Sequence, residues 1–248
     1  MNDCRLILIS LVCLALGARA ADSQPPVLVA TNPPPVRESS VSLGLALSRG
    51  NSDTVLATGA FKTHQKGPNN ELLGGLDGSY GESDHVKNNE TVHGTAQYNH
   101  LFSERCYGYL NVEGLHDEIA DLQYRLTTGP GAGYYLLHEP GTSLAGEVGP
   151  SVINERLGSR DRSYASGRLA ERFERKLSVT ARLWQKAEIL PQLDGMQNYL
   201  VNTEIGLEAS LTKTLCLRVI LQDNFVNQPA PGRQGNDIKT VSGLVLKF

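Results

Sequence analysis

The sequence predicts an all-β fold, a closed antiparallel transmembrane β-barrel of about 12 strands with short periplasmic turns. The first observation is that apolar and polar residues alternate with period two through most of the chain beyond residue 40. The second is that these segments run for about 9 to 14 residues, long for globular strands but suited to tilted membrane strands. The third is that the chain stops flush on an aromatic residue, Phe248, at the end of such a segment.

The first 20 residues have the composition of a signal peptide. Arg5 precedes an apolar run over 6–16, and Ala18-Arg19-Ala20 fits a cleavage site. The apolar run is too short to span a membrane as a helix, which needs about 18 residues or more. We therefore expect residues 1–20 to be a cleaved signal peptide that directs the chain out of the cytoplasm.

A proline-rich segment follows over residues 21–39. It contains Pro25-Pro26 and Pro33-Pro34-Pro35 and few bulky side chains. Such a composition favours an extended tether over a folded unit. We expect a passive periplasmic linker, with a partner-binding segment as the alternative. The barrel domain is then expected over residues 40–248.

From residue 40 the pattern repeats as strand, turn, strand. In the first segment Val41, Leu43 and Leu45 alternate with small or polar residues, and the later segments alternate in the same way. Long helical periodicity is missing. The predicted strands are 40–49, 54–65, 70–81, 89–102, 105–116, 122–137, 142–156, 163–175, 178–190, 197–210, 214–226 and 237–248.

The last segment has two distinct faces. Phe248, Leu246 and Leu244 share one face, whereas Lys239 and Lys247 share the other. It resembles the closing strand of a bacterial outer-membrane barrel, where the terminal aromatic belongs to the assembly signal. The resemblance implies that Phe248 belongs to such a signal and that the partners are outer-membrane lipid and the barrel-assembly machinery.

The connections between the predicted strands alternate in length. The shorter ones lie at 66–69, 103–104, 138–141, 176–177 and 213, and the longer ones at 83–88, 116–122, 157–162, 191–196 and 227–237. Short periplasmic turns and longer outer loops are typical of outer-membrane barrels. An even strand count returns both termini to the periplasm. The first hairpin, at 50–53, is a short exception on the outer side.

Charged residues in the second half of the chain keep a common parity along each strand. In a soluble β-sandwich these charged residues would form the solvated outer face. The signal peptide, strand lengths and loop asymmetry favour a barrel instead, and in a barrel the same residues point into the lumen and pair across strands. Glu171 and Asp223 fall on the apolar parity, which indicates an interface or a local bulge. The predicted lumen-lining residues are Arg168, Arg172, Arg182, Lys186, Glu188, Glu204, Glu208 and Arg218.

Few other chemical signals stand out. The net charge of −3 gives no indication of nucleic-acid binding. Cys106 and Cys216 remain after signal cleavage, and we favour two unpaired cysteines over a disulfide. The 6 histidines lack metal-ligand spacing, and we expect neither a metal site nor a cofactor. The glycines of 129–133 lack the strand–loop–helix setting of a phosphate loop and instead give bulky lumen side chains room to approach.

Several motifs resemble a known family. They are the segment 44–54 with its Gly50-Asn51-Ser52 turn, the glycine-rich segments 129–135 and 146–150, and the terminal Phe248. Together they resemble the salt-induced outer-membrane proteins of Gram-negative bacteria, whose domain is of unknown function. The resemblance covers about residues 40–248. It implies an outer-membrane location and a β-barrel fold, but no activity and no catalytic residues.

Three functional hypotheses follow. The first is a structural or stress-related envelope barrel whose charged lumen is largely plugged by its own side chains, since wide channels come with about 16 strands. The second is a narrow channel for ions or small solutes. The third, an outer-membrane lipid hydrolase, is less favoured because His93 lies on the lumen parity and no Ser–His pair is marked out. The oligomeric state is left open.

Overall fold

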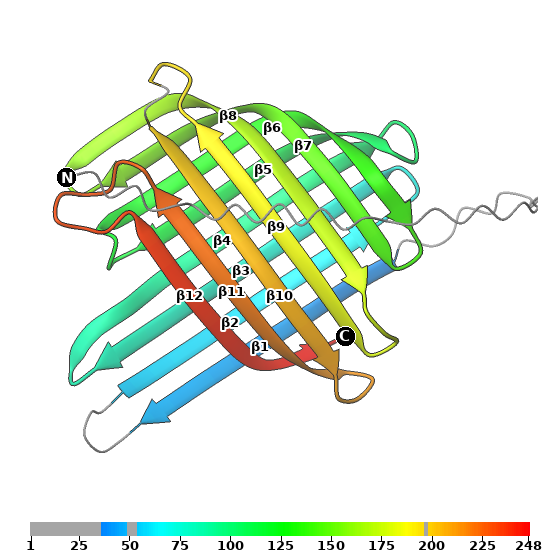
Figure 1. The fold of residues 1–248 in the computed structure, drawn as a ribbon, viewed down its shortest axis with the longest axis horizontal. Coiled ribbons are helices and arrows are strands. Elements are labelled where there is room, and N and C mark those ends of the chain that lie inside the picture. The colour runs from blue at the N-terminus through cyan, green and yellow to red at the C-terminus, as the bar shows by residue number, and fades with distance from the viewer. Residues whose placement is uncertain (1–35, 49–53, 196–197) are drawn as a thin grey trace, which may run out of the picture. The chain divides into compact units, whose positions relative to one another are not determined.

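A computed structural model describes residues 36–48, 54–195 and 198–248 of the chain. Within them, 12 strands form a closed antiparallel barrel in which each strand pairs with its sequence neighbours and β1 pairs with β12 (Figure 1). The described residues contain no helix long and apolar enough to cross a membrane. The predicted fold class and strand number are confirmed. The predicted signal peptide, residues 21–35 and the 50–53 hairpin tip lie outside the described residues.

The strands follow the predicted order and differ from the predicted bounds mainly at their ends. They are β1 Val36–Ser48, β2 Thr54–Lys66, β3 Asn70–Ser83, β4 Val86–Leu101, β5 Cys106–Asp117, β6 Leu122–Glu139, β7 Thr142–Leu157, β8 Arg160–Lys176, β9 Ala181–Pro191, β10 Tyr199–Ser210, β11 Leu215–Val226 and β12 Asn236–Lys247.

The first strand begins earlier than the sequence pattern predicts. β1 starts at Val36, so residues 36–39 of the predicted linker belong to the sheet. Two pairings explain this difference. Val36 is registered with Lys66 of β2. In addition, the Ser39 N–H donates to the Phe248 carbonyl at 3.2 Å, and the Phe248 N–H donates to the Ser39 carbonyl at 3.0 Å.

The predicted contrast between short turns and long loops is only partly right. The connections at the end of the barrel that holds Phe248 are short, two to four residues each. At the opposite end, three connections predicted to be long are also tight: 84–85, 118–121 and 158–159. Asp84, His85 and Gly158 have positive φ values of 50°, 63° and 59°, which close these hairpins and let the strands continue. Only 192–198 and 227–235 are longer among the described connections.

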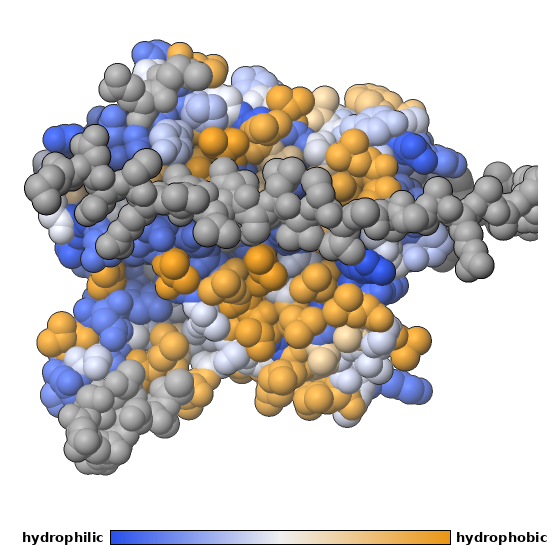
Figure 2. Space-filling view, in the orientation of Figure 1, coloured by the Kyte–Doolittle hydropathy of each residue, from blue (hydrophilic) through white to orange (hydrophobic). Residues whose placement is uncertain are grey.

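The outer wall of the barrel is apolar. On β12, Leu244 and Leu246 are 51% and 52% exposed, whereas Val245 between them is fully buried, and Phe248 directly after the strand is 70% exposed. The same alternation recurs on the other strands, so large apolar side chains stand on the outside of the wall (Figure 2). The predicted faces of the last strand are therefore confirmed, and the polar parity turns inward.

Glu171 and Asp223 are acidic residues on the outward, apolar parity, for which the sequence predicted an interface or a local bulge. Glu171 is exposed and accepts a hydrogen bond of 3.0 Å from Gln185 on β9. Asp223 lies three residues from the end of β11. The pairing of β8 with β9 and of β11 with β12 runs through both positions without a register shift. The bulge interpretation is therefore wrong, and the interface interpretation stands as the prediction for both.

Inward glycines make room for aromatic rings on the neighbouring strand. Tyr107 is registered directly with Gly133, Tyr109 with Gly131, and Trp184 with Gly206. A Cβ atom at these three glycines would lie only 2.2, 2.3 and 1.9 Å from the facing ring. This confirms that the glycine-rich segment 129–133 serves close packing of bulky interior side chains.

The two cysteines in the described part of the chain are unpaired. Cys106 lies exposed at the start of β5, and Cys216 is buried on β11. The sequence-based preference for unpaired cysteines over a disulfide is confirmed.

Candidate functional site

Side chains from strands that are not neighbours meet inside the barrel. Gln97 on β4 donates a hydrogen bond of 2.8 Å to Glu147 on β7. The Tyr135 hydroxyl on β6 donates one of 3.3 Å to Glu71 on β3. Strands separated by others in a closed sheet can touch only across the interior, so these contacts define the inside of the barrel. We treat this interior as the candidate functional site.

Glu147 is the centre of one interior cluster. Its carboxylate is 5% exposed and accepts hydrogen bonds of 2.8 Å from Arg168 and from the Tyr107 hydroxyl. Arg172 lies 3.5 Å away. Arg168 also donates to Glu188 on β9 at 2.5 Å, which connects three adjacent strands. A buried carboxylate with this many donors is fixed in orientation.

Glu208 is the centre of a second cluster. It is 2% exposed and pairs with Arg218 at 2.6 Å, with Lys247 at 2.6 Å and with Arg182 at 3.4 Å. The four side chains come from β9, β10, β11 and β12. Arg182 also reaches Glu174 on β8, at 3.4 Å. Ion pairs therefore link five consecutive strands along this side of the interior.

Glu204 and Trp184 form a third cluster next to it. The indole N–H donates to Glu204 at 2.7 Å, and Lys186 lies 3.6 Å from the same carboxylate. Lys62 approaches Glu204 from β2 at 3.9 Å and lies 5.8 Å from the indole ring. Arg182 and Arg218 stand at 5.5 and 5.8 Å from this ring. The ring thus lies among three cations that its π face attracts.

Two further carboxylates organise clusters that the sequence analysis did not identify. Glu155 is fully buried and pairs with Arg125 at 2.6 Å and with Arg162 at 2.7 Å. Glu71 accepts hydrogen bonds of 2.7 Å each from His64 and Asn99. The sequence signal that could have identified Glu155 and Glu71 is their position on the inward face of their strands. They were missed because neither carboxylate has a charged neighbour of the same parity close by in sequence.

His93 lies between two carboxylates. One ring nitrogen is 3.1 Å from Asp77 and the other 3.0 Å from Glu113. Because carboxylates engage both ring nitrogens, this histidine is not arranged to activate a serine nucleophile. Within the described ranges, no group of three or more His, Cys, Asp or Glu side chains is placed to hold a metal ion.

One mouth of the barrel is covered by the connection between β11 and β12. Ala230 in this connection is 3% exposed and packs against Leu122 at the start of β6 and Leu157 at the end of β7. The connection therefore reaches across the mouth from β11 and β12 to the opposite wall (Figure 1). Buried apolar side chains, including Leu190 and Leu200, fill part of the interior.

The eight charged residues singled out in the sequence fall into these clusters. Arg168, Arg172 and Glu188 belong to the Glu147 cluster. The Glu208 and Glu204 clusters hold Arg182, Arg218 and Lys186. Each positive side chain is paired with a carboxylate from another strand. Phe248, predicted as an assembly signal, is exposed at the end of β12.

The fold is similar to that of several solved outer-membrane proteins. The NanC porin matches with a TM-score of 0.52 and 6% identity, over 84% of this chain and 98% of that chain. The translocator domain of the autotransporter NalP from Neisseria meningitidis matches with a TM-score of 0.46 and 13% identity, over 86% and 88% of the two chains. The KdgM porin matches with a TM-score of 0.45 and 10% identity, over 86% and 99%. Identities this low concern the fold alone.

No curated protein is significantly similar to the chain. The model of the family described as "Protein of unknown function, DUF481" matches residues 41–248. This match begins one residue after the predicted start of the barrel, residue 40, and reaches the last residue of the chain. It confirms the predicted resemblance to a family whose domain has no known function. The chain therefore belongs to the DUF481 family.

Proposed function

We propose that the protein is an outer-membrane β-barrel with a structural or stress-related role in the cell envelope, and that its own side chains close its lumen. A closed sheet leaves few backbone edges, and the apolar outer wall matches what a bilayer requires of a spanning barrel. The porin-like fold and the signal peptide expected at residues 1–20 support the same location.

Contacts that bridge the lumen carry the proposal of a closed interior. Lys62 on β2 reaches Glu204 on β10 at 3.9 Å, and Lys239 on β12 donates to Thr91 on β4 at 3.1 Å. In each case the two strands stand four positions apart in the ring of 12, a third of the way around. Side chains that meet over this separation span most of the width of the barrel, so they obstruct passage along its axis.

The cover over one mouth supports the same conclusion. The connection that carries Ala230 packs onto β6 and β7, so solute arriving from that side meets an apolar contact. Wide aqueous channels come with barrels of about 16 strands, whereas barrels of about 8 strands are filled by side chains. A barrel of 12 strands lies between these sizes, so it is the paired charges inside it, and not the strand number, that favour a closed interior.

One observation favours a narrow channel as the second candidate. Several interior side chains keep access to solvent: Lys186 is 51% exposed, His64 42% and Lys62 34%. A thin water-filled path along these groups would let small ions pass. The two candidates differ in whether the resting barrel conducts.

Recording from planar lipid bilayers distinguishes the two candidates. We expect the wild-type barrel to give no steady conductance. The double variant Lys62→Ala, Lys239→Ala should conduct, because both bridging side chains are shortened. Glu174→Gln, which alters a partly exposed pair with Arg182, serves as the control and should remain closed. Steady wild-type conductance that changes when Arg182 and Lys186 are neutralised would contradict the closed interior and support the channel.

A further inference from the structure

Three turns at the end of the barrel that holds Phe248 share one construction. They are the four-residue connections 102–105, 177–180 and 211–214. Each begins with a large apolar residue, whose N–H donates to the carbonyl four positions later at 2.8–2.9 Å. A serine or threonine follows, and its hydroxyl oxygen accepts from the backbone N–H groups two and three positions further on. Such bonds from side chain to backbone fix the shape of a turn, so all three present their first residue in the same way.

The apolar residue that opens each turn is exposed at the edge of the outer wall. Phe102, Leu177 and Leu211 are 69%, 53% and 57% exposed. Each continues the outward parity of the strand before it, as Leu211 follows the exposed Leu207 of β10. In a spanning barrel the end of the apolar wall marks the level where hydrocarbon gives way to lipid head groups. The three turns therefore lie at the level of the head groups.

Two of these turns and the chain end are joined into one stretch of the rim. The Thr180 carbonyl accepts a hydrogen bond of 2.7 Å from the Ser210 N–H, which links the β8–β9 turn to the β10–β11 turn. The Thr214 carbonyl accepts one of 2.8 Å from the Lys247 N–H, which links the second turn to the end of the chain. Figure 1 shows both turns beside the C-terminus. We call residues 175–181, 210–215 and 247–248 the rim arc.

The rim arc carries positive charge that no protein group neutralises. Arg175, Lys176 and Lys213 are exposed, and within the described part of the chain none of them has an ion-pair partner. Segments 175–181 and 210–215 contain no aspartate or glutamate. The cations inside the barrel differ, because carboxylates hold them, as Glu208 holds Lys247 at 2.6 Å. Three free cations thus stand next to the exposed leucines of the two turns, and the carboxylate of the chain end leaves the arc net positive.

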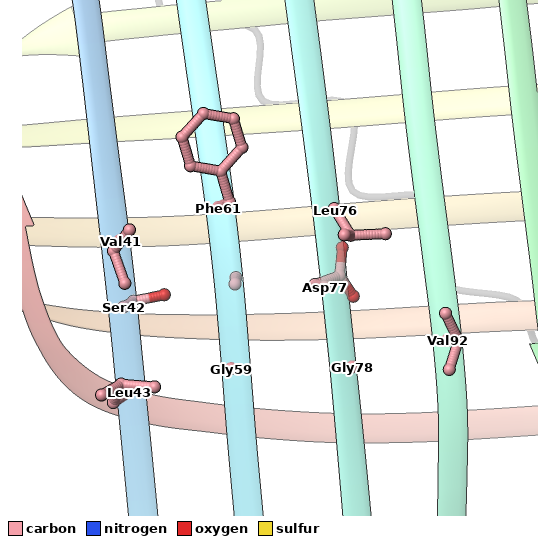
Figure 3. A pocket seen from close by; sticks show the side chains of 10 residues that line it. Val41, Ser42, Leu43, Gly59, Phe61, Leu76, Asp77, Gly78 and Val92 are labelled. Atoms are coloured by element: carbon pink, nitrogen blue, oxygen red, sulfur yellow. The ribbon is translucent and has the colours of Figure 1, made fainter.

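An apolar hollow elsewhere on the outer wall has no such charge. Phe61, Leu76 and Val92 line it on β2, β3 and β4, and Gly59 and Gly78 form part of its floor (Figure 3). No lysine or arginine is among the residues that line it. A lipid chain in this hollow makes the same contacts whatever head group it carries. The hollow therefore serves as a reference surface that does not distinguish lipids by charge.

We propose that the rim arc binds phospholipids with a net negative head group, from the leaflet at the Phe248 end of the barrel. The lipid phosphates accept charge-assisted hydrogen bonds from Arg175, Lys176 and Lys213, and Leu177 and Leu211 pack against the first carbons of the acyl chains. A zwitterionic head group brings an amine that the same cations repel, so the arc selects the anionic lipid. The inference rests on the proposed membrane location and does not depend on whether the lumen conducts.

Photolabelling with two lipids that differ only in head group tests the selectivity. The barrel is reconstituted into phosphatidylcholine vesicles that contain a small fraction of phosphatidylglycerol or phosphatidylcholine, each with a diazirine near the start of one acyl chain. Mass spectrometry maps the label, and the measured quantity is the ratio of phosphatidylglycerol to phosphatidylcholine label. We expect about fivefold on turns 177–180 and 211–214, the factor that one basic residue contributes near anionic lipid. In the hollow around Phe61 and Leu76 the ratio should be one.

The triple variant Arg175→Gln, Lys176→Gln, Lys213→Gln should lower the ratio on both turns to one, and its exposed positions leave the fold intact. Arg160→Gln with Arg233→Gln is the matched control, because these exposed cations also lack ion-pair partners among the described residues but lie at the opposite mouth. A wild-type ratio of one on the two turns, or a raised ratio that survives the triple variant, would overturn the proposal. Failure of the wild type to insert into the vesicles would instead count against the membrane location itself.

The depth of one turn in the bilayer gives a second test. Leu211→Cys and Lys213→Cys are each spin-labelled in a Cys106→Ser background, where the buried Cys216 is shielded from the reagent. Electron paramagnetic resonance then compares collisions with oxygen, which concentrates in hydrocarbon, and with a water-soluble nickel chelate. We expect position 211 to favour oxygen and position 213 to favour nickel. If both favour nickel, the turn stands in water clear of the lipid, its cations face an acidic partner in solution, and the lipid assignment is refuted.

Discussion

Replacement of Glu208 by glutamine gives the sharpest test of the ion-pair clusters. The substitution keeps the shape of the side chain but removes the charge shared by Arg218, Lys247 and Arg182, which lie 2.6, 2.6 and 3.4 Å away. Removing one partner from a buried pair costs about 3–5 kcal/mol. Arg218 is only 6% exposed, but Arg182 and Lys247 are 31% and 38% exposed and can turn to water. We therefore expect Glu208→Gln to cost about 3 kcal/mol, the lower end of the range.

The assay is urea unfolding of the barrel in phospholipid vesicles, followed by the fluorescence of Trp184, the only tryptophan of the chain. Glu174→Gln is the matched control. It removes a carboxylate from the same Arg182, but this pair is 31% and 43% exposed and should contribute about 0–1 kcal/mol. Equal losses of unfolding free energy for the two variants would refute the view that Glu208 is the buried centre of its cluster.

Three further predictions follow from the packing and from the chain end. Gly206→Ala should displace the Trp184 ring, because the added Cβ would lie 1.9 Å from it. The change should lower the free energy of unfolding by about 1–3 kcal/mol and shift the tryptophan emission. An unchanged emission spectrum would contradict the packing of Trp184 against Gly206. Maleimide should label Cys106 but not the buried Cys216 in the folded barrel, and both after unfolding, as mass spectrometry can measure. Deletion of Phe248 removes two backbone hydrogen bonds to β1 and should lower the membrane-inserted fraction recovered from cells, and an unchanged fraction would argue against an assembly role.

Most of the fold was predictable because a barrel wall repeats one simple pattern. Each strand faces two different environments, so apolar and polar residues alternate, and 12 strands could be counted from that alternation. The tight turns were less predictable. Asp84 and His85 both adopt positive φ, a conformation that is uncommon outside glycine even for Asp and His, so the sequence around them reads as a longer loop. The short pairing of β1 with β12, registered at four positions, was also unpredictable, because alternation along a strand does not reveal where the pairing with its neighbour stops.

The candidate site was predictable in outline but not in its connections. Parity alone identified Arg168, Arg182 and Glu208 as sharing a polar face, because charged residues recur on their strands. Which charges pair depends on the register between strands, which parity leaves undetermined. Glu147 and Glu155 were missed because neither has another charged residue of the same parity close by on its strand.

The tight hairpins opposite the chain end have a consequence for how a cell displays this barrel. In the proposed orientation, the two-residue connections 84–85 and 158–159 leave almost no polypeptide above the rim of the wall. Among the connections that the structure describes at this end, antibodies, bacteriophages and surface proteases would then meet mainly the one between β9 and β10 and the one that carries Ala230. Immune or phage pressure on related proteins should therefore concentrate sequence variation in these two segments and leave the hairpins at 84–85, 118–121 and 158–159 nearly constant in length.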